Sequence, residues 1–138
     1  MGAHVESTID RWFTAPFQER RADVVDPVRA MIRATKPAGY IGCIHAIKGL
    51  DLVGRQNAIQ VPTLIIVGEE DPASPVANSQ AIHERIQGSE LVILKSAAHL
   101  SNMEQPEAFN RVVLAFLEKF GTGGGPFKDR ASSRGRVS

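Results

Sequence analysis

Residues 61–99 read VPTLIIVGEEDPASPVANSQAIHERIQGSELVILKSAAH, and this stretch decides the fold. Two apolar runs, 63–67 and 91–94, lack the alternation of a half-solvated strand and are typical of parallel strands covered on both faces. The segment between them predicts a helix that begins at Pro75, with Ser74 as its N-cap. Two parallel strands joined by a helix form a right-handed βαβ unit, so we expect an α/β protein.

One carboxylate and one histidine follow the two predicted strands. Asp71 lies just after the first strand, and His99 lies just after the second. In open α/β sheets, functional groups lie on loops beyond the carboxyl ends of the strands. We therefore expect Asp71 and His99 at the same edge of the sheet, where a carboxylate can orient a catalytic imidazole.

Three predicted helices precede the strands, and one follows them. The second holds Pro27 near its start, where a missing backbone N–H does least harm. The last has apolar residues at regular helical spacing and ends at Gly121. The predicted helices cover residues 4–14, 21–35, 40–49 and 106–120.

The chain divides into three predicted segments. Residues 1–49 form a helical segment, residues 50–120 form an α/β core segment, and the Gly-, Ser- and Arg-rich residues 121–138 predict a disordered tail. Two strands are too few for a stable parallel sheet, because apolar strands need neighbours and covering helices. We therefore expect the chain to be part of a larger sheet.

The composition is that of an ordinary globular protein. The 138 residues carry a net charge of +1, which gives no reason to expect a nucleic-acid or membrane partner. No apolar run approaches the length of a membrane span. The single cysteine, Cys43, excludes an intrachain disulfide and is typical of a cytoplasmic protein. It lies in an apolar predicted helix, where we expect it to be buried.

Three stretches resemble a known family. The residues VPTLIIVGEEDPASP (61–75) and SAAHLSNMEQPEAFN (96–110) are similar to the C-terminal half of α/β-hydrolases, in particular the 3-oxoadipate enol-lactonases. The residues IDRWFT (9–14) resemble the start of the cap of those enzymes. The resemblance implies a partial α/β-hydrolase fold, in which a helical cap precedes the last two parallel strands and helices of the sheet.

The same resemblance implies a reaction and two catalytic residues. In that family a Ser–Asp–His triad follows the chain in this order, so Asp71 is expected to be the acid and His99 the base. The expected substrate is a small ester or lactone, namely an enol-lactone that is hydrolysed to 3-oxoadipate in the β-ketoadipate pathway of aromatic catabolism. The resemblance implies no cofactor and no metal.

The nucleophile of this family is missing from the sequence. None of the nine serines lies in a Gly-x-Ser-x-Gly motif, which normally precedes the cap and carries the nucleophile. The loop that supplies the oxyanion donors also belongs before the cap. We therefore expect a truncated chain that is inactive on its own.

Other interpretations remain open at this stage. Trp12, the only tryptophan, has helical spacing with Ile9 and Phe13, which suits either a core position or the wall of a substrate pocket. Asp71 and His99 would also serve another hydrolase subclass, such as an esterase, a C–C bond hydrolase or a cofactor-free haloperoxidase. A non-catalytic chain is a further alternative, which would bind a partner or a second copy through an exposed sheet edge.

Overall fold

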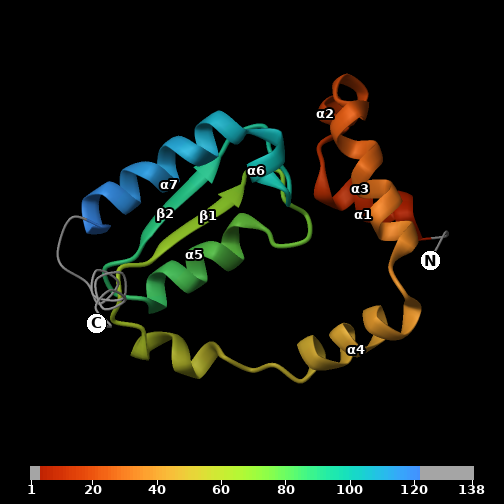
Figure 1. The fold of residues 1–138 in the computed structure, drawn as a ribbon. Helices are drawn as coiled ribbons and strands as arrows, with labels where there is room; N and C mark the ends of the chain where they lie inside the picture. Colours follow the sequence, from red (N-terminus) through yellow and green to blue (C-terminus); the bar gives the residue numbers. More distant parts are fainter. Residues whose placement is uncertain (1–3, 122–138) are drawn as a thin grey trace, which may run out of the picture.

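The structure, a computed structural model, describes residues 4–121 (Figure 1). The helices within residues 5–34 lie beside the α/β segment, and residues 37–58, which form an α-helix and a 3-10 helix, run between the two (Figure 1). The tail predicted at 121–138 lies outside the described residues from residue 122 onward. The elements in chain order are α1 (Val5–Trp12), α2 (Ala15–Arg20), α3 (Ala22–Ala34), α4 (Pro37–Lys48), the 3-10 helix η2 (Val53–Ala58), β1 (Leu64–Gly68), α5 (Val76–Arg85), β2 (Glu90–Leu94), α6 (Ser101–Glu104) and α7 (Pro106–Gly121).

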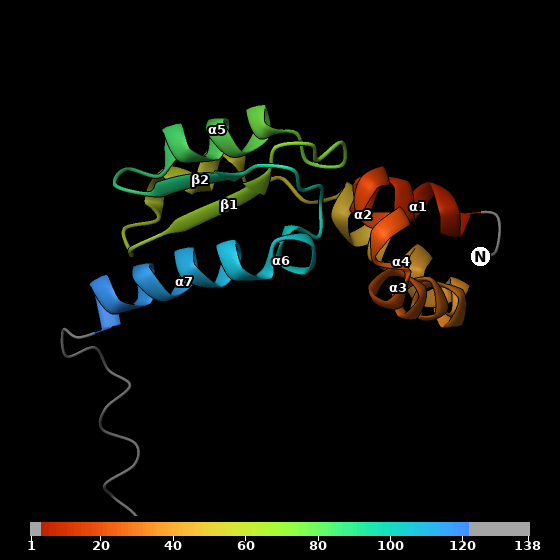
Figure 2. The ribbon, with the colours of Figure 1, turned by 90° about the horizontal axis from the view of Figure 1, so that it is seen from above.

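The two strands form a parallel pair between two helices. Their register runs from Leu64 opposite Glu90 to Gly68 opposite Leu94. Helix α5 lies on one face of the pair and α7 on the other (Figure 2). Coverage on both faces explains why the strands are apolar without alternation. The predicted α/β class and βαβ unit are confirmed, and each strand lies within one residue of its predicted bounds.

The helical segment has a core of its own. Ile9 and Phe13 are almost fully buried, and the rings of Phe13 and Phe17 stack with centroids 5.6 Å apart. Leu100 and Met103, which follow the histidine of interest, pack against the same core. This core therefore also anchors the loop after β2. Its buried members are Val5, Ile9, Phe13, Phe17, Val25 and Val28.

The predicted cap of α5 is wrong. The helix begins at Val76, Pro75 is its extended N-cap residue with ψ 152°, and no side chain caps the helix. The reason is local, because Asp71 Oδ1 accepts hydrogen bonds from the backbone N–H groups of Ala73 and Ser74. These bonds hold the loop in a turn up to Ser74, so the helix starts later than the sequence predicts.

Proline placement and short helices also differ from expectation. Pro27 lies inside α3, not near its start. Pro27 removes one backbone hydrogen bond of the helix, and the burial of Val25 and Val28 beside it offsets that loss. Helices α2 and α6 were not predicted, since each spans only a turn or two and has too little sequence to show a period.

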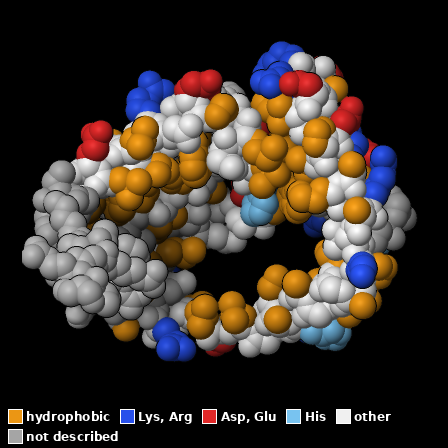
Figure 3. Space-filling view, viewed as in Figure 1, with side chains coloured by type: hydrophobic (Ala, Val, Ile, Leu, Met, Phe, Trp, Pro, Cys, Tyr) orange, Lys and Arg blue, Asp and Glu red, His pale blue; other side chains and the backbone are white. Residues whose placement is uncertain are grey.

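Helix α4 is the least packed part of the described chain. Its apolar side chains Tyr40, Ile41, Ile44 and Ile47 are between 42% and 69% exposed. Cys43 is also exposed, so the prediction that it is buried is wrong. The sequence placed it on an apolar helix, but α4 runs along the open side of the molecule and the space-filling view shows a hollow between it and the α/β segment (Figures 1 and 3).

No helix within residues 4–121 combines the length and the apolar character that a membrane crossing requires.

Candidate active site

The loops after β1 and β2 are joined by backbone hydrogen bonds. The N–H of Glu69 donates to Leu94 O at 2.9 Å, and the N–H of Glu70 donates to Ala97 O at 2.9 Å. Gly68 makes this close approach possible, because a Cβ at residue 68 would lie 2.2 Å from Ala98 O. The two strand ends are thereby held at one sheet edge, which places Asp71 beside the loop that carries His99.

Asp71 is a buried carboxylate, and the hydrogen bonds of its side chain are made to residues of this site. Its side chain is 5% exposed. Oδ1 accepts hydrogen bonds from the N–H groups of Ala73 at 2.8 Å and Ser74 at 2.9 Å. Oδ2 lies 2.8 Å from His99 Nδ1. The two backbone donors fix the carboxylate plane, so that one oxygen remains directed at the imidazole.

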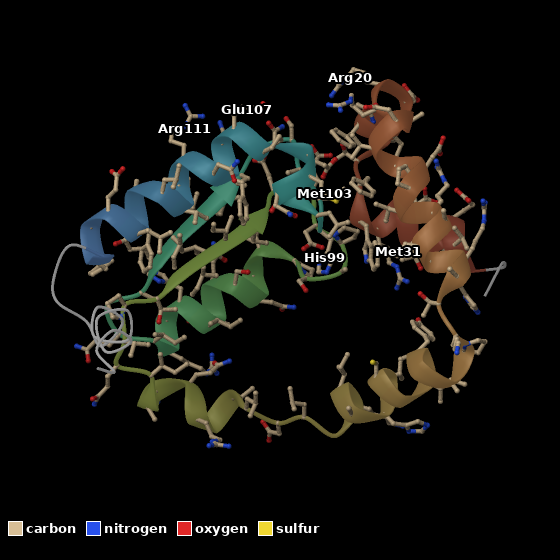
Figure 4. All side chains as sticks on the ribbon, viewed as in Figure 1. Arg20, Met31, His99, Met103, Glu107 and Arg111 are labelled. Carbon is tan, nitrogen blue, oxygen red and sulfur yellow. The ribbon has the colours of Figure 1, made fainter. Side chains whose placement is uncertain are left out.

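The imidazole of His99 is held through Nδ1 by Asp71, and part of the ring is exposed to solvent. Its side chain is 37% exposed and lies between the α/β segment and the helical segment (Figure 4). Because Oδ2 of Asp71 is an acceptor, the Nδ1–H group donates a hydrogen bond to it, and in the neutral ring Nε2 keeps its lone pair. An imidazole in this tautomer can take a proton from a hydroxyl group or a water molecule through Nε2.

Trp12 contacts His99 from the helical segment. The two rings are stacked, with centroids 6.5 Å apart and an interplanar angle of 28°. The backbone also joins here, because Leu100 N–H donates to Trp12 O at 2.9 Å. Trp12 also packs partly against the helical core, which is one of the two positions that its spacing left open.

A cavity of about 250 Å³ lies next to this tryptophan. It is bounded by α1, α3, the start of α4 and the loop after Asp71. Trp12 is therefore shared between the cavity wall and the imidazole contact. The lining residues are His4, Thr8, Arg11, Trp12, Ile32, Thr35, Tyr40 and Ala73.

One polar residue of the site was missed by sequence reasoning. Glu104 is buried, at 7% exposure, and accepts hydrogen bonds from Thr14 N and Thr14 Oγ1, each at 2.8 Å. It also accepts a hydrogen bond from the N–H of Ala98, the residue before His99. The only signal was a lone acid between Met103 and Pro106, which by itself predicts an exposed side chain.

The structure brings together Asp71, His99 and Trp12, the three residues that the sequence singled out. None of the serine hydroxyls within residues 4–121 forms a hydrogen bond with the imidazole of His99. No three His, Cys, Asp or Glu side chains in the same part of the chain are grouped as metal ligands. The described site is thus an acid–imidazole pair beside an aromatic-walled cavity.

The chain is similar to known α/β-hydrolases. Residues 47–128 match an α/β-hydrolase family described as TAP-like protein. 3-Oxoadipate enol-lactonase 2 of Acinetobacter baylyi is 35% identical over 115 residues, which are 83% of this chain and 43% of that protein. 3-Oxoadipate enol-lactonase 1 of the same organism is 30% identical over 114 residues, which are 83% of this chain and 42% of that protein.

A solved structure agrees with these sequence matches. The crystal structure of the enol-lactonase from Burkholderia xenovorans LB400 superposes with a TM-score of 0.83 at 35% identity, over 86% of this chain and 45% of that one. The chain therefore spans less than half the length of the relatives that it matches. Because the family match covers more than half of the 138 residues, and the fold and these relatives agree with it, the chain belongs to the α/β-hydrolase family and represents the C-terminal part of its fold.

Proposed function

We propose that Asp71 and His99 are the acid and the base of a serine-type hydrolase that acts on an enol-lactone. The single observation that carries this proposal is the 2.8 Å hydrogen bond between Asp71 Oδ2 and His99 Nδ1, made by a buried carboxylate that two backbone donors fix. This is the arrangement by which a carboxylate sets the tautomer of a catalytic imidazole and stabilises it when it becomes charged.

The proposed mechanism gives each group one role. The serine hydroxyl attacks the lactone carbonyl carbon while its proton moves to His99 Nε2. The ring C–O bond then breaks, and the imidazolium returns the proton to the leaving oxygen. Water hydrolyses the acyl-serine by the same route, with His99 again taking and returning a proton. The chemistry requires no cofactor, because the nucleophile, the base and water suffice.

The nucleophile in this proposal comes from outside the 138 residues. The sequence contains no Gly-x-Ser-x-Gly motif, and the enol-lactonases that it resembles are more than twice as long as the matched region. We therefore propose that this chain has no turnover when it is assayed alone. Residues 1–49 would act as the cap and residues 50–120 as the C-terminal part of the core.

The proposed substrate follows from the relatives and from the cavity. Both curated relatives reported above are 3-oxoadipate enol-lactonases, so a small cyclic ester is the substrate class that we propose. The cavity of about 250 Å³ beside Trp12 is large enough for a small ring. The corresponding role is a cytoplasmic step in the β-ketoadipate pathway of aromatic catabolism.

A fusion protein tests this function. The part of the Acinetobacter baylyi enol-lactonase 2 that precedes its matched region would be joined to the start of this chain. We expect the fusion to hydrolyse the enol-lactone and the 138-residue chain alone not to do so. His99→Gln should lower kcat of the fusion by about 10³-fold or more. His45→Gln is the matched control, because His45 is exposed on α4.

Two results would contradict the proposal. One is saturable turnover by the chain alone that His99→Gln abolishes, since the nucleophile would then lie within these residues. The other is a folded, active fusion whose rate is unchanged by His99→Gln. A panel of simple esters, haloperoxidase substrates and C–C hydrolase substrates on the same fusion would distinguish the other hydrolase subclasses.

A second candidate is partner binding without catalysis. Each described strand has one described neighbour only, and Ile93 in β2 is 40% exposed. An open strand edge of this kind can pair with a strand of another chain, and a second copy of this chain is the partner that we propose for it.

A further inference from the structure

A buried carboxylate outside the acid–base pair joins the two halves of the described chain. Glu104 lies at the end of α6, and its Oε1 accepts two hydrogen bonds from Thr14, one from N–H and one from Oγ1, each at 2.8 Å. Its Oε2 accepts a third from Ala98 N–H. Thr14 belongs to the bend between α1 and α2, whereas Ala98 belongs to the loop after β2.

Three hydrogen-bond donors point at the two carboxylate oxygens of Glu104, and a neutral amide could not accept from all three. A carboxylate presents acceptors on both oxygens, whereas an amide presents one oxygen and an NH₂ group. In a Glu104→Gln variant, the NH₂ group of the new amide would face either Ala98 N–H or the two Thr14 donors. Two donors would then oppose each other in a buried position, where an unsatisfied group is costly. The site therefore requires a carboxylate and not merely a polar residue of that length.

The contacts of Glu104 act on the backbone that carries His99. Ala98 is the residue before His99. It is 2% exposed, and its carbonyl oxygen lies close to Gly68. On the other side of His99, Leu100 N–H donates to Trp12 O at 2.9 Å. The histidine is thus held on both flanks by bonds that lead to the segment around Trp12 and Thr14.

We propose that Glu104 is a positioning residue. It holds His99 in hydrogen-bonding distance of Asp71 and keeps the helical segment packed over the imidazole. Glu104 forms no hydrogen bond with the imidazole and touches no reacting atom, so it acts through Ala98. The same bond network places the Trp12 ring on His99. The inference rests on the proposed function only in that His99 is taken as the base.

The tautomer of His99 is a readout that needs no activity. The 138-residue chain would be labelled with ¹⁵N-histidine, and the imidazole ¹⁵N signals would be recorded at a pH where the ring is neutral. Because Nδ1 donates to Asp71, wild-type His99 should be in the Nδ1–H form, whereas a free neutral side chain prefers the Nε2–H form. Asp71→Asn provides the reference spectrum for a lost pair.

The decisive variant is Glu104→Gln, with Glu107→Gln as its control. Glu107 is an exposed acid in the first turn of α7, a few residues away. We expect Glu104→Gln to lose the Nδ1–H form of His99 while the circular dichroism of the chain stays that of a folded protein. We expect Glu107→Gln to leave both signals unchanged.

Each remaining outcome has a defined meaning. If a folded Glu104→Gln chain keeps the Nδ1–H form, the positioning role is wrong, although the proposed function stands. If the wild-type chain itself lacks this form, the acid–base pair is wrong, and both proposals fall. If Glu104→Gln does not fold, Thr14→Val decides, because it removes only the Oγ1 bond at 2.8 Å. A partial loss of the Nδ1–H form then supports the role of Glu104, and a wild-type spectrum overturns it.

Discussion

The indole of Trp12 stacks on the imidazole of His99 across the boundary between the helical and α/β segments, with centroids 6.5 Å apart. The contact joins α1 to the loop between β2 and α6. Since Trp12 is the only tryptophan, the fluorescence of the chain reports on the surroundings of this one side chain, which include His99. Trp12 fluorescence can therefore be used to monitor the site directly in the 138-residue chain.

Replacing His99 should change the fluorescence of Trp12. In His99→Ala, the indole loses a neighbouring ring and gains solvent contact, so we expect a different intensity and a red-shifted emission maximum. His45→Ala, on the exposed helix α4, should leave the spectrum unchanged. Identical spectra for wild type and His99→Ala would show that the two rings are not in contact in solution.

Gly68→Ala should destabilise the chain much more than Gly42→Ala. A Cβ at residue 68 would meet backbone atoms, Ala98 O at 2.2 Å and Ala97 O at 2.3 Å, which cannot rotate away. We expect a loss of about 3 kcal/mol in the free energy of unfolding, measured by urea denaturation.

The matched control for this change is Gly42→Ala in α4, where no atom lies within 4 Å of the new methyl group. Because alanine is the better helix former, this variant should be unchanged or stabilised by up to about 1 kcal/mol. Equal stability of the Gly68→Ala chain and wild type would contradict the close approach of the two loops.

Ile9→Ala should show that the helical segment has a true core. Ile9 is fully buried between α1 and α3, so we expect a loss of about 3 kcal/mol in the free energy of unfolding. Ile47→Ala, which changes a residue that is 69% exposed, should cost less than about 0.5 kcal/mol. Similar losses for the two variants would mean that the burial differs in solution.

The exposed apolar surface should lead to self-association. Sedimentation velocity over a range of concentrations should show a species heavier than the 15.0 kDa monomer. If the sheet edge carries the contact, as we propose, the variant Ile44→Asn/Ile47→Asn on α4 should leave association intact. A monomer at every concentration would contradict binding of a second copy, and loss of association in the α4 variant would move the contact to that helix.

The βαβ unit could be predicted because its signals are local. The apolar runs of β1 and β2, and the helix between them, each lie within a few residues, and parallel strands place their carboxyl ends at one edge. The proximity of Asp71 and His99 follows from that topology alone, and the 2.8 Å contact confirms it. Their catalytic roles remain predictions.

Other features depend on contacts between distant residues, and the sequence could not supply them. Glu104 can be buried because Thr14 and Ala98 supply three hydrogen-bond donors to it. No pattern in the sequence near residue 104 predicts these contacts. Cys43 illustrates the opposite error. Its apolar neighbours predict burial, but burial requires a partner surface that covers the side chain, and the structure buries no residue of α4. Periodicity shows which side chains are able to pack, not what they pack against.

The central claim is that the Asp71 carboxylate orients His99 for proton transfer, and one measurement tests it most directly. In the fusion with the preceding part of the Acinetobacter baylyi enol-lactonase 2, kcat for enol-lactone hydrolysis would be compared between wild type and Asp71→Asn. Glu70→Gln, a change of the exposed acid next to it, is the control. We expect Asp71→Asn to lower kcat by about 10⁴-fold with KM little changed, because an amide at this position favours the wrong tautomer of the imidazole. A fall that matches the effect of Glu70→Gln, in a fusion that is folded and active, would contradict the claim.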